Sequence, residues 1–188
     1  MDLVKMTENE CLESGMEIIY RKEYAVPGSI ASSITSFALE DQWPKQDSWM
    51  LHSNYAVDTA APQTLDLRFC VTGNRYCSNE ACKVCSARNA DSCPAATDTL
   101  SLFNFRFTPN YLNQFVSGNK EKSKKEHVLA FEYKTSFVKL FPVCPRQRTT
   151  LSALLERNYT GTMENIFINS KIHGILLYSM DCLIEEKT

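Results

Sequence analysis

Hydrophobic and polar residues alternate in short segments across the first two thirds of the chain. The clearest segment is 65–71, which reads Leu-Asp-Leu-Arg-Phe-Cys-Val. A period of two directs the apolar side chains to one face of a β-strand and Asp66, Arg68 and Cys70 to the other. The segment is therefore predicted to be a half-buried antiparallel strand.

Three other segments have strand-like patterns. Segment 97–108 has Phe103, Phe105 and Phe107 on one face. In segment 49–57, apolar residues share one side and Ser53 interrupts them; these residues are Trp49, Leu51, Tyr55 and Val57. Segment 34–39 is less regular. Several short strands separated by turn residues favour a sandwich or a barrel. The first part of the chain is therefore predicted to be mainly β.

A short helix is predicted directly after segment 97–108. Thr108 can act as its N-cap, Pro109 suits the first helical position, and Gly118 is a stop signal. These signals predict a helix of about two turns. The lysine-rich stretch 117–127 that follows has no apolar residue, so we expect a solvated loop there, with a cationic patch for a partner as the alternative.

The period of the apolar residues changes after Pro145. Leucines at helical spacing predict a helix that begins near Thr149 or Thr150, and Gly161 is expected to break it. Thr162 is then expected to cap a second, longer helix that is apolar over more than one face. We expect this helix to contact the sheet on one side and a second subunit on the other, the alternative being a buried helix of a monomer. The residues assigned to dimerisation are Leu151, Leu155, Ile168, Ile172, Ile175 and Leu176.

Charge and hydropathy exclude several classes of protein. The net charge is −2, with 20 Lys and Arg against 22 Asp and Glu, so this chain lacks the basic field that holds a phosphate backbone. The N-terminus carries acids without an apolar core segment, and the chain nowhere has 18 consecutive apolar residues. The sequence therefore predicts a cytoplasmic protein with no membrane partner.

Five of the eight cysteines lie close together in the sequence, at Cys70, Cys77, Cys82, Cys85 and Cys93. A cytoplasmic protein keeps its thiols reduced, which favours metal binding over a disulfide framework. Four thiolates suit tetrahedral Zn²⁺, and the spacing of Cys82 and Cys85 lets two sulfurs from one turn reach one ion. Cys77, Cys82, Cys85 and Cys93 are the predicted zinc ligands.

Other chemistry remains open for the same cysteines. Their spacing also matches a plant-type iron–sulfur pattern, with the fourth ligand from Cys93, Cys70 or Cys144. A thiol–disulfide switch is a further alternative, and so is a surface loop with ordinary cysteines.

Catalysis is not indicated. The three histidines, His52, His127 and His173, are far apart in the sequence, and neither a nucleophile elbow nor a phosphate-binding loop is present. We therefore expect a protein that is not an enzyme. One face of segment 65–71 is expected to line a small-molecule pocket, but the sequence does not say which face.

The stretch from Tyr159 to Asp181 resembles the helical segment of AraC-family regulators of the pyochelin-regulator type, in which a Tyr-x-Gly turn precedes a helix with a central Lys and a Leu-rich end. Segment 12–18, Leu-Glu-Ser-Gly-Met-Glu-Ile, resembles the opening of such proteins from Bacteroidetes, and segment 107–115 resembles the end of their β domain. The resemblance implies a cupin-like or jelly-roll sensor domain over residues 1–145, with the Cys-rich loop 70–93, and a helical dimerisation and relay segment over residues 146–188.

The resemblance further implies a pair of helix-turn-helix units after this segment. In this interpretation the chain ends before the DNA-binding domain, forms a homodimer, contacts DNA only through that missing domain, and senses an unknown small-molecule or metal effector. The alternative hypothesis is a stand-alone module that binds zinc or acts through thiol redox chemistry, with no DNA-binding part.

Overall fold

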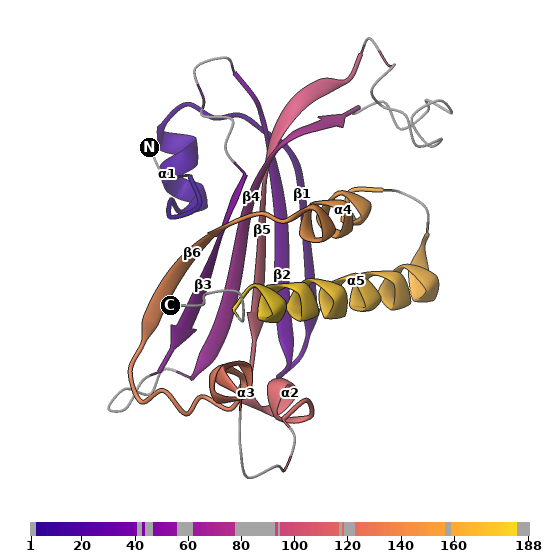
Figure 1. The fold of residues 1–188 in the computed structure, drawn as a ribbon. Coiled ribbons are helices and arrows are strands. Elements are labelled where there is room, and N and C mark those ends of the chain that lie inside the picture. Colours follow the sequence, from indigo (N-terminus) through magenta and orange to yellow (C-terminus); the bar gives the residue numbers. More distant parts are fainter. Residues whose placement is uncertain are drawn as a thin grey trace.

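The strands form one open antiparallel sheet in the order β1-β2-β5-β4-β3-β6 (Figure 1). The computed structural model describes residues 3–40, 43, 47–55, 62–77, 93, 95–116, 118, 123–156 and 159–183. The strands are β1 (Ile18–Val26), β2 (Ile30–Ala38), β3 (Ser48–Asn54), β4 (Thr64–Tyr76), β5 (Thr97–Phe107) and β6 (Phe137–Pro142). The prediction of a mainly β fold is confirmed. Because β1 and β6 lie at opposite edges of the sheet, the predicted cupin-like or jelly-roll barrel is not confirmed.

The four strands that alternation indicated are present. β5 matches its predicted segment to within one residue, whereas β3 ends at Asn54, before the predicted end, and β4 continues past Val71 to Tyr76. β2 begins four residues before the expected start at Ile34, and Val57 lies outside the described residues. The sequence pattern missed β1 and β6, the two edge strands. Neither of them contains a fully buried residue, so their apolar and polar positions contrast less than those of the central strands.

One face of the sheet carries the main hydrophobic core. Trp49 is fully buried there between the rings of Phe69 and Phe141, with centroid distances of 5.4 and 4.5 Å. Each such aromatic pair adds about 0.5–1.5 kcal/mol beyond the burial of its area. Helices α4 (Pro145–Leu154) and α5 (Gly161–Cys182) cross this face and cover the core (Figure 1).

The boundaries of these two helices differ from the prediction. α4 begins at Pro145 rather than near Thr149 or Thr150, because proline suits the first helical position and Gln147 accepts a hydrogen bond from the Cys144 N–H at 3.0 Å. Gly161 begins α5 instead of breaking a helix, and its φ of 59° accounts for a glycine at this turn. The buried Gln147 amide also donates to Ser179 Oγ at 3.1 Å, which ties α4 to α5.

Two short helices close one end of the same core (Figure 1). α2 (Pro109–Asn113) is capped by Thr108 as predicted but ends before Phe115, well short of Gly118. α3 (Lys124–Leu129) begins inside the stretch 117–127 that was expected to be a loop and continues two residues past it. Ser123 and Glu126 form a capping box there, and this local signal outweighs the lysine-rich composition.

Helix α1 (Glu8–Glu13) and the segment before it cover part of the opposite face of the sheet. The buried side chains Leu3, Val4 and Cys11 of these elements, and Met16 just after α1, pack with Phe37, Cys70, Leu100 and Leu102 from the strands. No helix among the described residues is long and apolar enough to span a membrane.

Candidate ligand pocket on the open face of the sheet

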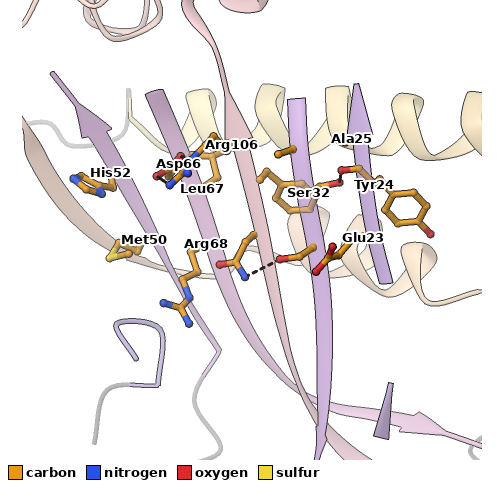
Figure 2. Close-up of a pocket in the computed structure, with 14 residues that line it drawn as sticks. Glu23, Tyr24, Ala25, Ser32, Met50, His52, Asp66, Leu67, Arg68 and Arg106 are labelled. Carbon is orange, nitrogen blue, oxygen red and sulfur yellow. Dashed lines mark hydrogen bonds and ion pairs between the residues drawn. The ribbon is translucent and has the colours of Figure 1, made fainter. Parts of the chain in front are cut away.

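The part of this second face that α1 leaves uncovered forms a hollow of about 490 Å³ (Figure 2). Its floor consists of side chains from β1, β2, β3, β4 and β5 that point away from the main core. Most of them are polar or charged. A volume of this size falls in the range of natural small-molecule sites.

Strand register arranges these side chains in two rows across the sheet. The first row contains Met50, Arg68, Asn104, Ser33 and Glu23, which are consecutive cross-strand partners from β3 to β1. The second row is related to it by two residues along each strand and contains His52, Asp66, Arg106, Ala31 and Ala25. Cross-strand neighbours of this kind have Cβ atoms about 4.5–5.5 Å apart, so each row is continuous.

In the second row the charges are already paired. Arg106 donates Nε–H and one terminal N–H to the two carboxylate oxygens of Asp66, at 2.8 and 2.9 Å. This bidentate contact raises the pKa of Arg106 above its ordinary value. Asp66 and Arg106 therefore form a neutral pair at the floor of the hollow.

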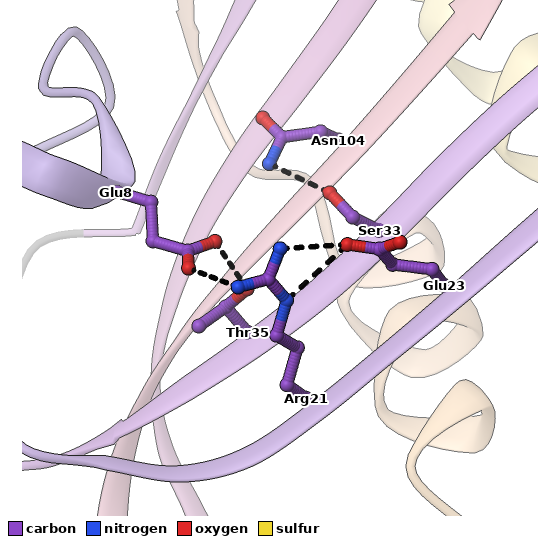
Figure 3. A network of polar contacts seen from close by, with 6 residues as sticks. All are labelled: Glu8, Arg21, Glu23, Ser33, Thr35 and Asn104. Atoms are coloured by element: carbon purple, nitrogen blue, oxygen red, sulfur yellow. Dashed lines mark hydrogen bonds and ion pairs between the residues drawn. The ribbon is translucent and has the colours of Figure 1, made fainter.

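At the β1 end, Glu23 belongs to a network that also attaches α1 (Figure 3). Arg21 donates to Glu23 at 3.2 and 2.7 Å and to Glu8 of α1 at 2.7 Å. Thr35 donates to the other oxygen of Glu8 at 3.1 Å. The hydrogen bond to Glu23 and the nearby Glu8 raise the pKa of Arg21. The network holds α1 beside the hollow and neutralises part of the charge of Glu23.

Arg68 is the second residue of the first row, next to Met50, and Figure 2 shows it between Met50 and Glu23. Its Nε atom is buried and has no hydrogen-bond partner among the described residues. Burial is the largest effect on this group and lowers its pKa, against the opposing influence of nearby Cys11, Cys70 and Glu10. Next to it, Asn104 donates to Ser33 Oγ at 3.2 Å.

The structure decides which face of segment 65–71 lines a pocket. Leu65, Leu67 and Phe69 are fully buried beneath the helices, whereas the side chains of Asp66 and Arg68 line the hollow. Sequence reasoning missed Glu23, Ser33 and Asn104. Asn104 belongs to a predicted strand, but only pairing in the folded sheet makes it a neighbour of Arg68.

Two of the four predicted zinc ligands lie within the described residues. Cys77 and Cys93 are buried, at 7% and 8% exposure, and pack together with Ala96, so the first and the last of the four predicted ligands lie close together. Cys82 and Cys85 lie outside the described residues. Within the described ranges, no three His, Cys, Asp or Glu side chains form a group that could hold a metal ion.

The other cysteines proposed as cluster ligands lie elsewhere. Cys70 packs under α1, and an extended strand of seven residues, roughly 20 Å, separates it from Cys77. Cys144 is the N-cap residue of α4. Neither residue belongs to the cluster of Cys77 and Cys93.

The residues assigned to dimerisation hold the helices to the sheet. Leu151, Ile168, Ile172, Ile175 and Leu176 are buried in the main core, and Leu155 is packed against it. Their side chains are thus occupied within one chain, and a second subunit would meet a different side of α5. Exposed apolar residues of α5 are Met163, Ile166 and Leu177, at 56%, 58% and 57% exposure.

Comparison with protein-family models, with curated proteins and with solved structures finds no match for this chain.

Proposed function

We propose that the chain is the effector-sensing and dimerisation region of a DNA-binding transcription regulator of the AraC type. The resemblance of segment 159–181 and the presence of a pocket on the sheet support this function. DNA would be contacted by helix-turn-helix units that are not part of these 188 residues. The cupin-like form of the sensor domain stays a prediction of the resemblance.

The single observation that carries the proposal is the outer side of α5. Met163, Ile166, Ser170, His173 and Leu177 are all exposed and follow one another at spacings of three and four residues. This 3-4 spacing is typical of the seam of a coiled coil, in which about one residue per helical turn inserts into the neighbouring helix. The sheet occupies the other side of α5, so this stripe is suited to a helix of a second copy.

A two-fold axis near Ser170 would make the stripe self-complementary. In an antiparallel arrangement, Met163 of each copy meets Leu177 of the other, because both residues are seven positions from Ser170. The small side chain of Ser170 allows close approach at the crossing point. α5 has 22 residues and is about 33 Å long, which is sufficient for several layers of contact.

The oligomeric state of the 188-residue chain tests this proposal. Sedimentation equilibrium at about 100 μM should give a dimer for the natural chain and a monomer for the Met163→Lys/Leu177→Lys variant. Leu12→Lys is the matched control, because Leu12 is an exposed leucine of α1 at 43% exposure, and it should leave the dimer intact. A natural chain that is monomeric at this concentration would contradict the proposal.

A reporter assay then addresses regulation. The chain is fused to a DNA-binding domain that represses transcription only as a dimer, and repression should depend on Met163 and Leu177 but not on Leu12. Repression equal in all variants would show that α5 is not the dimer contact.

A second candidate function is a zinc-binding or thiol-redox module, which the meeting of Cys77 and Cys93 favours. Elemental analysis of protein purified under reducing, chelator-free conditions should give about one zinc per chain, lost in the Cys82→Ser/Cys85→Ser variant. Cys144→Ser is the control, since serine also suits the N-cap position of α4. Absence of metal together with reversible oxidation of Cys77 would favour the redox function.

A further inference from the structure

One cation of the pocket, Arg68, has no counter-charge in hydrogen-bond contact among the described residues. Asp66 is paired with Arg106, and Glu23 is paired with Arg21. Arg68 lies two residues from Asp66 along β4, in the same row as Glu23, and forms neither a hydrogen bond nor an ion pair with any described residue. An arginine remains protonated in proteins, so its charge persists despite burial.

Helix α1 does not supply the missing partner. The acid of α1 that acts on the pKa of Arg68 is Glu10, and its effect is the weakest of the groups that do so. The Glu10 carboxylate instead accepts a hydrogen bond of 2.6 Å from the Thr7 N–H and caps α1. Cys11 is fully buried, and burial raises the pKa of its thiol, which keeps it neutral beside Arg68.

Leaving a partly buried charge without a hydrogen-bonded partner is unfavourable, and a hydrophobic residue in the same row would avoid that cost. A guanidinium presents a planar fork that matches the two oxygens of a carboxylate. Beside it, the Asn104 amide has a carbonyl oxygen and a second N–H beyond the bond it makes to Ser33. The first row thus has a charged guanidinium, that of Arg68, next to a neutral amide, that of Asn104.

We propose that the hollow binds a small monocarboxylate, with its carboxylate on the Arg68 guanidinium, a hydroxyl or carbonyl group on Asn104 of the next strand, and its apolar part over the Ala25–Ala31 pair beyond it. A single negative charge fits better than a phosphate dianion, because the carboxylates of Glu23 and Asp66 lie in the neighbouring positions. This inference rests on the proposed function and names the chemical class of its effector.

Thermal unfolding of the full 188-residue chain with small probes tests the inference. Hexanoate and benzoate are titrated up to about 10 mM, beside hexanol, hexylamine and inorganic phosphate as neutral, cationic and dianionic probes. We expect a saturable rise in Tm of about 2–4 °C with the two carboxylates and a smaller or no rise with the other probes.

Two variants assign the effect to Arg68. Arg68→Met should abolish the carboxylate response while the Tm of the unliganded chain stays the same or rises, because the variant removes a charge that has no hydrogen-bonded partner. Arg146→Met is the matched control, since Arg146 is an exposed arginine of α4 on the other face of the sheet, and it should keep the response. Arg68→Lys should weaken the response through loss of the planar fork.

Three results would overturn the inference: no carboxylate response, an equal response to hexanol, or a marked loss of folding in Arg68→Met, which would give Arg68 a structural role. Its failure is separable from that of the proposed function. A dimer that binds no carboxylate contradicts this inference alone, whereas a monomer with an Arg68-dependent response contradicts only the proposed function.

Discussion

Tyr111 donates its phenolic hydrogen to Nε2 of His173, with 2.8 Å between the two atoms, and this bond joins α2 to the exposed side of α5. The direction follows from the other ring nitrogen. Nδ1 of His173 lies 2.8 Å from the carbonyl oxygen of Asn169, which can only accept, so Nδ1 carries the proton in the neutral ring and Nε2 accepts. The ring of Tyr111 also stacks on Phe107 at the end of β5, at 5.6 Å between centroids.

Tyr111→Phe should therefore have a small effect on stability. The variant loses one partly exposed hydrogen bond and keeps the stack on Phe107, so the free energy of unfolding should fall by about 1 kcal/mol or less. Tyr111→Ala should cost about 3–5 kcal/mol, because it also removes the ring. Urea unfolding followed by fluorescence measures both. Equal losses in the two variants would mean that the hydroxyl, not the ring, holds α2 to α5.

Stability should decrease at alkaline pH. Burial raises the pKa of Cys11 above its ordinary 9.0 and the pKa values of Tyr24 and Tyr111 above their ordinary 10.0. The folded chain holds these protons more tightly than the unfolded chain, so the stabilisation is complete below the unfolded values and is lost as pH rises through the folded ones.

The Tm, measured under reducing conditions between about pH 7 and about pH 11, should thus be level at first and fall above about pH 9. Tyr111→Phe should make the fall shallower. A Tm that stays level over the whole range would contradict the assignment.

Gly73 should tolerate alanine less well than Gly28. Both have a positive φ, 86° and 74°, which costs a residue with a Cβ about 1–2 kcal/mol. A Cβ on Gly28 meets nothing within 4 Å, whereas a Cβ on Gly73 comes within 3.2 Å of the Arg148 guanidinium. That guanidinium donates to the Thr72 carbonyl and pairs with Asp47.

Chemical denaturation should give a loss in the free energy of unfolding of about 1–2 kcal/mol for Gly28→Ala and about 2–4 kcal/mol for Gly73→Ala. Identical losses would mean that Arg148 moves freely.

Gln147 and Ser179 should be energetically coupled. Gln147→Met keeps the volume but leaves the buried Ser179 hydroxyl and the Cys144 N–H without the amide, at a cost of about 1–3 kcal/mol. Ser179→Ala in the Gln147→Met background should cost less than Ser179→Ala alone. A double-mutant cycle by urea unfolding should give a coupling of about 0.5–3 kcal/mol, and strict additivity would show that the α4–α5 hydrogen bond contributes nothing.

Much of the core could be predicted from the sequence. Alternation in segment 65–71 assigned its apolar and polar side chains to different faces, and the structure has them so. Edge strand β1 was missed because Lys22 occupies a partly buried position between Tyr20 and Tyr24, so the sequence of this strand does not alternate between apolar and polar residues. The pocket was predicted only as one face of segment 65–71, and its lining on other strands was missed because Asn104 and Ser33 have no local signal of their own. They become neighbours of Arg68 only through the pairing of β2, β5 and β4.

The sequence by itself determined that the central strands direct apolar side chains to one face and polar side chains to the other. This follows because the backbone of an extended chain places successive side chains on opposite faces, whatever surrounds them. It also determined the short helix capped by Thr108, because a cap depends on residues within one turn. The tertiary structure decided which faces are covered. α4 and α5 cross one face, and α1 covers only part of the other, attached through Glu8 and Arg21. Which face a helix covers depends on the free energy of contacts between residues far apart in the sequence, and a local sequence pattern gives no information about those contacts.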